Sequence, residues 1–413
     1  MNYWLLLILL FIFFNYFLST IVSICNLQTL HKELPDEFSD TFDNQSYLKS
    51  QRYTKATTSL SLIESTLSVI ITICFIILGG FNLVDQFARS LGFSEIVTGL
   101  IFTGTLLLLS LVLSLPFSII STFYVEERFG FNRTTPLLFV TDLIKGIGLT
   151  IFIGGPILWL ILILFEIGGQ RAWIYCWAGV VIISFVLQFL APVLIMPLFN
   201  KFTPLASGTL KDKIESYADA ESFAIQGIFT MDGSKRSAKL NAFFTGFGKF
   251  RKIVFFDTLL EKLNDDEILA VLAHEMGHFK KRHIWFMMIL SVLQTGLIFF
   301  FLSLILKNEH LFDAFGMEHL STYASLVFFG FLYSPLSTFL SLVINHFSRK
   351  HEFQADQYAA ETTGSGDRLI SGLKKLSLEN LSNITPHPLT VFITYSHPPV
   401  LMRIAALRKL SLG

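Results

Sequence analysis

Residues 264–306 read NDDEILAVLAHEMGHFKKRHIWFMMILSVLQTGLIFFFLSLIL, and this stretch joins a polar helix start, the motif HEMGH and an apolar block. Asn264 is followed three positions later by Glu267, which is the capping-box pattern that opens an α-helix. No proline or helix-ending signal intervenes between Ile268 and Leu306, so the sequence predicts one continuous helix. We therefore expect HEMGH to lie at or just below a membrane surface, on a helix that goes on to cross the bilayer.

The rest of the chain is organised around apolar blocks of similar length. Of its 413 residues, 52% are hydrophobic and 15% charged, and the mean hydropathy is +0.60. A helix needs about 20 apolar residues to cross about 30 Å of hydrocarbon. Seven blocks meet this requirement: 4–24, 62–81, 97–120, 147–165, 172–194, 284–306 and 321–344. The first block lacks a basic n-region and a small-residue cleavage site, so we expect it to be an uncleaved membrane helix.

The predicted fold class is an α-helical multi-pass membrane protein of about seven transmembrane helices with a small α+β domain. Within the first large polar segment, KLNAFFTG (239–246) and KIVFFD (252–257) are typical of the two strands of a β-hairpin. The two polar segments flank the last helical pair, so we expect one domain built from both. The chain then divides into a membrane region with five helices (1–199), a first part of the polar domain with HEMGH (200–283), two membrane helices (284–346) and a second part of the polar domain with EFQAD and YSHPP (347–413).

Charge predicts the orientation and narrows the partners. Lys and Arg are more frequent in the segments after the first and third apolar blocks than in those after the second, fourth and sixth. Because positive residues are retained on the cytoplasmic side, the N-terminus should lie outside or in a lumen, with both parts of the polar domain and the C-terminus in the cytoplasm. The membrane would be the cell membrane in a bacterium or the endoplasmic reticulum in a eukaryote. With 31 basic and 31 acidic residues, the chain has no net field for nucleic acid, and its expected partners are the lipid bilayer and a peptide or protein substrate.

The motif HEMGH has the spacing of a zinc site. His274 and His278 are four residues apart, so on a helix both imidazoles lie on one face and can reach a single Zn²⁺. Glu275 sits beside the first histidine, where it can take a proton from the activated water without being a ligand. A chain of this composition contains H-E-x-x-H by chance in roughly 1 case in 100, so the motif needs further ligands to support it.

A catalytic zinc ion needs a third protein ligand and an open position. His283 follows the motif closely, but the glycine-permitted bend of the metzincin pattern is missing, so it is rejected as a metzincin ligand while its own role stays open. Glu352, in the run EFQAD, is the better candidate because a second helix can supply the carboxylate of a His₂Glu site. Asp356, one turn further on, can then accept the second N–H of a zinc histidine. The alternative is that Glu352 and Asp356 form an ordinary acidic pair on a solvated helix.

Several further motifs, taken together, resemble those of the CAAX prenyl protease type 1 family. They are GSKRS, NAFF and IVFFDTLL within 231–260, HEMGH, Ser348-Arg349 before EFQAD, YSHPP at 395–399, and Glu126-Glu127 with Gly130-Phe131-Asn132. These motifs occur in the family's order from about residue 115 to 405. The resemblance implies zinc-dependent endoproteolysis of the gluzincin type, with one Zn²⁺ held by His274, His278 and Glu352. It further implies Glu275 as general base, Asp356 behind the ligands, and helices that enclose an intramembrane chamber.

Two substrate-facing roles remain hypotheses. By resemblance His397, with Arg403 near it, would stabilise the oxyanion that forms on the scissile carbonyl; alternatively His397 caps a turn before two prolines. Asn241, followed by Ala242 and Phe243, opens a strand at the expected sheet edge, to which an extended substrate can add as a further strand. Asn241 could equally be an ordinary strand-start residue.

The family resemblance implies that the substrate is a protein whose C-terminal C-a-a-X cysteine is prenylated and whose last three residues are removed. In an organism without prenylation, the same machinery would degrade misfolded or stalled membrane proteins. A different class, a transporter or scaffold with a vestigial protease domain, would fit polar residues inside the apolar blocks, such as Asn15, Glu64, Glu166, Gln188 and Gln294. These residues are also expected in a water-lined interior or in hydrogen bonds between helices.

Overall fold

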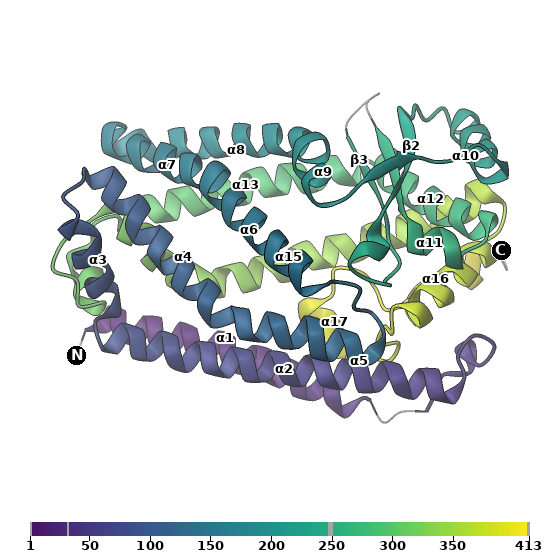
Figure 1. Ribbon diagram of the computed structural model, residues 1–413, viewed down its shortest axis with the longest axis horizontal. Helices are drawn as coiled ribbons and strands as arrows, with labels where there is room; N and C mark the ends of the chain where they lie inside the picture. Colours follow the sequence, from purple (N-terminus) through teal and green to yellow (C-terminus); the bar gives the residue numbers. More distant parts are fainter. Residues whose placement is uncertain (1, 31–32, 247–250, 411–413) are drawn as a thin grey trace.

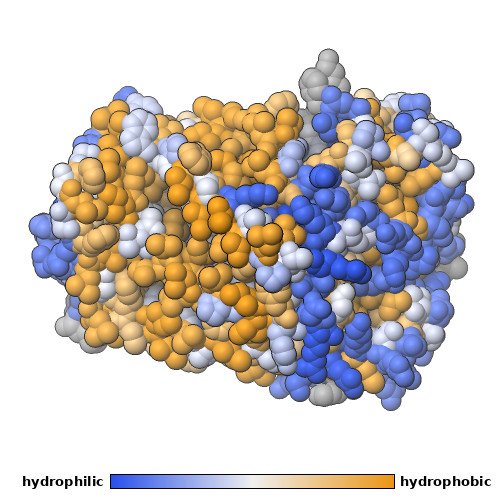
Figure 2. Space-filling view, viewed as in Figure 1, coloured by the Kyte–Doolittle hydropathy of each residue, from blue (hydrophilic) through white to orange (hydrophobic). Residues whose placement is uncertain are grey.

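Among the residues that the computed structural model describes, which are 2–30, 33–246 and 251–410, seven helical spans are long and apolar enough to cross a membrane. The predicted fold class is thus confirmed. Figure 2 shows an apolar surface band between polar ends, and Figure 1 places the β-sheet and the C-terminus at the end opposite the N-terminus. The spans are Tyr3–Gln28, Asn44–Ile77, Glu95–Phe129, Pro136–Ile167, Gly169–Phe199, His283–Ile305 and Thr322–Thr363.

The helices depart from the predicted blocks mainly at their ends. Helix α2 (Asn44–Ile77) begins in polar sequence and stops before residue 81, because Gly79 takes a left-handed φ of 69° and turns the chain into α3 (Gly80–Ser90). Three spans contain a π-helical segment, so that each is made of several pieces. These are α4 (Glu95–Ile120), Ser121–Glu126 and α5 (Glu127–Phe129); α6 (Pro136–Leu149), Thr150–Gly154 and α7 (Gly155–Ile167); and α8 (Ala172–Leu190), Ala191–Ile195 and α9 (Met196–Phe199).

A four-stranded sheet lies at the polar end, in the order β1-β2-β4-β3. The predicted hairpin is confirmed as β3 (Ala242–Thr245) antiparallel to β4 (Lys252–Phe256), whereas β1 (Phe202–Pro204) and β2 (Gly227–Met231) were not predicted. Strand β2 runs parallel to β4, so the strands are not all joined by hairpins. In the described sheet, β3 is an edge strand, and its residues Phe243 and Phe244 line a cavity together with Glu275 and His278.

Helices cover this sheet and share one apolar core with it. Ile214, Phe255, Leu272 and Leu373 are members of that core, and Phe38, from the segment after the first span, joins them. The N-terminal membrane region is therefore packed into the polar end. The helices of this end are α10 (Thr209–Ala220), α11 (Asp257–Lys262), α12 (Asp265–Lys280), α16 (Asp367–Glu379), α17 (Pro388–Thr394) and α18 (Val400–Leu410).

Helix α12 begins as predicted, with Asn264 and Glu267 forming both hydrogen bonds of a capping box. The prediction that this helix continues into the sixth span is wrong. Helix α12 ends at Lys280, and α13 (His283–Ile305) begins after Arg282, which takes a left-handed φ of 62°. No glycine or proline marks this break, and a left-handed conformation at a non-glycine residue costs about 1–2 kcal/mol.

The seventh span, α15 (Thr322–Thr363), is a single helix that runs from the apolar band into the polar end. Near its start, Tyr323 donates a hydrogen bond of 2.5 Å to Asp85 of α3, a residue with no exposed surface. Arg89 pairs with the same carboxylate at 2.8 Å. Together with α14 (Glu309–Ala314), these contacts close the end of the molecule opposite the sheet.

Two of the polar residues predicted inside the spans form hydrogen bonds between helices. Asn15 of α1 (Tyr3–Gln28) donates to Ser334 at 2.9 Å, and Gln294 donates to Tyr333 at 3.1 Å. Both bonds attach a neighbouring helix to α15. Gln188, in contrast, lines a cavity that reaches the HEMGH helix.

The break at Arg282 leads to a stability prediction. Arg282→Val should lower the free energy of unfolding by about 1 kcal/mol or more, because a β-branched residue is strained at positive φ, while Arg282→Gly should be at least as stable as the parent. Thermal unfolding of the detergent-solubilised protein measures both. Lys281→Val is the matched control, since Lys281 has an ordinary φ of −81°. Equal stability of the two valine variants would show that the break is not strained.

Candidate metal centre

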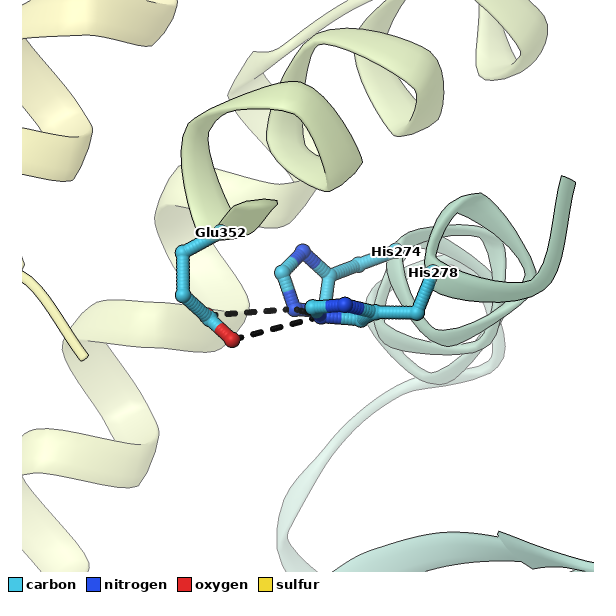
Figure 3. Close-up of side chains that lie close together, drawn as sticks. All are labelled: His274, His278 and Glu352. Atoms are coloured by element: carbon cyan, nitrogen blue, oxygen red, sulfur yellow. Dashed lines mark hydrogen bonds and ion pairs between the residues drawn. The ribbon is translucent and has the colours of Figure 1, made fainter. Parts of the chain in front are cut away.

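Three side chains from two helices converge on one point (Figure 3). His274 and His278 project from adjacent turns of α12, and Glu352 projects from α15. Their ligand atoms all lie within 4.8 Å of one another. The two Nε2 atoms are 3.3 Å apart, Glu352 Oε1 is 3.2 Å from Nε2 of His278, and Glu352 Oε2 is 3.5 Å from Nε2 of His274.

The chemistry of this cluster fits a divalent cation. Among the described residues Oε2 of Glu352 is buried and accepts no hydrogen bond, and the guanidinium of Arg403, 3.4 Å away, is already paired with Asp356. A carboxylate oxygen in this position is costly unless a further cation takes the place of the missing donor. The carboxylates of Glu275, Glu352 and Asp356 face the guanidinium of Arg403, so among the described residues the site carries two negative charges in excess when both histidines are neutral. Two imidazoles and one carboxylate, with space left for a fourth group, match the donor set of a catalytic zinc site.

The second ring nitrogen of His274 is held by a charged pair. Nδ1 lies 2.8 Å from Asp356, and Arg403 binds the same carboxylate through two nitrogens at 2.8 and 2.6 Å. Burial and the charge of Arg403 both lower the pKa of His274, but its hydrogen bonds to Asp356 and Glu352 outweigh them and raise it to about 9. Without a cation His274 thus keeps a proton at neutral pH, and a metal ion must displace this proton to bind.

The two residues predicted to face the oxyanion lie in different surroundings. Arg403 is buried, and its guanidinium contacts Glu352, at 3.4 Å from Nη1, as well as Asp356 and His274. His397 has a 65% exposed side chain, and its Nε2 lies 3.3 Å from Glu352. Ser396 Oγ is 2.9 Å from His397 Nδ1. If this hydroxyl donates, Nε2 carries the proton and faces the cluster.

Two cavities meet at the cluster, and Glu275 and His278 line both of them. The first, of about 650 Å³, is mainly apolar and lies among Phe243 and Phe244 of β3, Met287 of α13 and other residues of the spans. The second, of about 700 Å³, is more polar and is lined by residues that include Asn241, Asn380, His397 and Arg403.

The predicted substrate strand lies beside these cavities. Ala242 and Phe243 belong to β3, whose pairing partner in the described sheet is β4. The side chain of Asn241 accepts a hydrogen bond from the backbone N–H of Ala242 at 2.9 Å, which is what an ordinary strand-start residue does.

Sequence reasoning missed the contact of Gly277 with the second helix. There, a Cβ would lie 3.0 Å from the Cα and 3.1 Å from the carbonyl oxygen of Ala355.

A seven-span helical protein with two histidines of an HExxH motif and a glutamate from a second helix, opening beside an edge strand, has the features of a membrane metallopeptidase. Comparison with known proteins makes this specific. Residues 23–201 match a family described as "CAAX prenyl protease N-terminal, five membrane helices". Residues 204–411 match peptidase family M48.

Individual relatives agree with the family matches. CAAX prenyl protease 1 of Saccharomyces cerevisiae is 38% identical over 405 residues, which cover 91% of this chain and 88% of the relative. The human CAAX prenyl protease 1 homolog is 34% identical over 421 residues, with the same shares covered. The crystal structure of S. mikatae Ste24p superposes with a TM-score of 0.93 at 35% identity and covers 98% of this chain and 99% of that one. The chain belongs to peptidase family M48, in its CAAX prenyl protease branch, and is a multi-pass membrane metalloendopeptidase.

The close contact at Gly277 sets the distance between α12 and α15, and a substitution there should weaken metal binding. Gly277→Ala should lower the affinity for Zn²⁺ on the order of 10-fold, the size typical of disturbed support around metal ligands. The added methyl group meets backbone atoms of α15 that cannot swing aside. The affinity can be measured by competition with a chromophoric chelator. Gly372→Ala is the control, because its Cβ would meet Val271 at an ordinary 3.6 Å. Unchanged affinity in Gly277→Ala would show that the helices can separate without moving the ligands.

Proposed function

We propose that the metal is zinc, one ion per chain, and that His274, His278 and Glu352 are its ligands. The convergence of their ligand atoms within 4.8 Å is the observation that carries this proposal. The orphaned Oε2 of Glu352 and the excess of two negative charges support it. Asp356 orients His274 by accepting its Nδ1–H, and Arg403 holds Asp356 in place.

The bound ion would supply Lewis acidity toward the scissile carbonyl and the attacking water. Glu275 takes the proton from this water as the oxygen attacks the carbonyl carbon, and then passes the proton to the nitrogen of the departing amine. The exposed His397 donates its Nε2–H to the oxyanion as the carbonyl becomes tetrahedral. The substrate adds to β3 as a further strand, which presents its backbone to both cavities.

The substrate class that we propose is a protein with a prenylated C-terminal CAAX sequence, from which the last three residues are removed. The relatives named above support this, and so does the mainly apolar cavity that adjoins Glu275 and continues among the membrane spans, where a lipid chain could lie within a chamber. Degradation of misfolded membrane proteins would use the same residues without needing the lipid. A transporter or scaffold with a vestigial protease domain is not favoured, since every residue of the predicted mechanism is present.

We further propose that residues 200–283 and 347–413 act as one protease domain on the cytoplasmic side, with 1–199 and 284–346 in the membrane. The positive loops support this orientation, and seven spans put the two ends of the chain on opposite sides. In a eukaryotic cell the membrane would be that of the endoplasmic reticulum.

Glu275→Gln should retain zinc and lose peptide cleavage, because the amide cannot accept the proton of water but leaves the three ligands untouched. Zinc content per chain and cleavage of a fluorogenic peptide measure the two effects separately. We expect a stoichiometry near one and a loss of at least about 100-fold in kcat, the lower range for a general base. Cleavage by Glu275→Gln at the parent rate would disprove the assignment. His310→Gln, far from the site at the opposite end of the molecule, serves as a control for the purification.

A pair of peptides that differ only in the lipid tests the substrate class. The farnesylated CAAX peptide should be cleaved with a higher kcat/KM than its unlipidated twin, because the lipid buries apolar surface in the first cavity. Mass spectrometry should locate the cut after the modified cysteine. Equal cleavage of the twins would instead favour the quality-control alternative, and would leave the metal centre itself unchallenged.

A further inference from the structure

The outer ring nitrogen of His278 contacts a residue that the proposed mechanism does not use. Nδ1 of His278 lies 3.2 Å from Nδ1 of His283, the first residue of α13. Nε2 of His283 lies 2.9 Å from the side-chain oxygen of Gln354, on α15. His283 is only 5% exposed and stacks on His351 at a centroid distance of 4.0 Å and an angle of 9°. Gln354, His283 and His278 thus form a row of side-chain contacts that ends at a proposed metal ligand.

This contact depends on the break between α12 and α13. On an unbroken helix, five residues correspond to about 140° of rotation beyond a full turn, so His278 and His283 would point to different sides. The left-handed Arg282 ends α12 and redirects the chain, which brings the ring of His283 back to His278. Backbone strain of this kind concentrates at functional sites, where a specific side-chain position offsets its cost.

The ring protons in this row of contacts can be assigned by starting from Gln354. An amide oxygen only accepts hydrogen bonds, so with Oε1 of Gln354 facing the ring, His283 carries its proton on Nε2. Nδ1 of His283 is then an acceptor, and His278 must supply a proton on its own Nδ1. The lone pair of His278 Nε2 is left free, facing His274 and Glu352. The reverse assignment would put a proton on Nε2 of His278 and block the cation.

We propose that His283 is a positioning residue that fixes the tautomer and the ring orientation of His278, with Gln354 fixing His283 in turn. The inference rests on the metal centre proposed above and adds to it a second residue that orients a ligand. His274 is supported by an anion, Asp356, whereas His278 is supported by a neutral ring. A neutral acceptor orients the ligand without adding a fourth negative charge to a site whose excess already equals the charge of one divalent ion.

Zn²⁺ binding to the metal-stripped, full-length protein in detergent tests this role. His283→Phe keeps an aromatic ring against His351 but removes the acceptor, and should lower the affinity about 10-fold or more. His283→Asn, whose amide oxygen can occupy the place of Nδ1, should restore most of the affinity. His351→Phe makes the same ring replacement in the stacking partner and should leave it unchanged. In the Co²⁺-substituted protein, His283→Phe alone should alter the visible absorption spectrum, which reports the geometry of the ligands.

The outcomes separate the inference from the metal centre. A parent protein that fails to bind zinc would overturn both. If the parent binds one Zn²⁺ and His283→Phe binds it equally well, the metal centre stands and the role of His283 is wrong. Should His283→Phe fail to fold, Gln354→Leu takes its place, since losing the terminal acceptor frees His283 to adopt the blocking tautomer. Unchanged affinity in Gln354→Leu would then overturn the inference.

Discussion

The contact between α12 and α15 at Gly277 is the constraint on which the site depends. Two histidines on one helix can share a cation, but the proposed third ligand, Glu352, and the partner of His274, Asp356, come from the other helix. Gly277, inside the motif itself, lets the helix backbones approach to a distance that a methyl group would prevent. The middle of HEMGH is therefore part of the metal geometry, although it carries no ligand. The apolar core around α12 and the sheet keeps the helix in this position.

Much of the architecture could be predicted because it follows from local patterns. Apolar blocks of sufficient length have few alternatives to a membrane helix, and the capping box and the β3–β4 hairpin depend on residues close in sequence. The break at Arg282 could not be predicted, since it has no glycine or proline and arises from tertiary contacts. Strands β1 and β2 were missed for a related reason: they are short, and β2 is completed by a parallel neighbour distant in the chain.

At the site, the chemistry of the residues identifies the candidate ligands, but not the side chains that surround them. The spacing of His274 and His278 and the spare carboxylate of Glu352 pointed to one cation, and the structure brings these three together. The surroundings of Arg403 were not readable from sequence, because its partner Asp356 is 47 residues away on another helix. His397 was a candidate for the oxyanion role only because of the family resemblance. No spacing rule links it to HEMGH, and its closeness to Glu352 appears only once the chain is folded.

The length of α15 has a mechanical consequence. Its 42 residues span about 63 Å at 1.5 Å per residue, from the buried Asp85–Tyr323 contact at one end of the molecule to beyond Glu352 at the other. The depth of this carboxylate below the bilayer is therefore set by the hydrophobic length of the helix that carries it. A thicker or thinner membrane, which tilts a spanning helix, acts directly on Glu352. The two histidines follow any such displacement, because α12 packs against α15 at Gly277 and not only against its own span. Lipid composition thus bears on the catalytic centre as a whole, through the one helix that reaches it from the far end of the molecule.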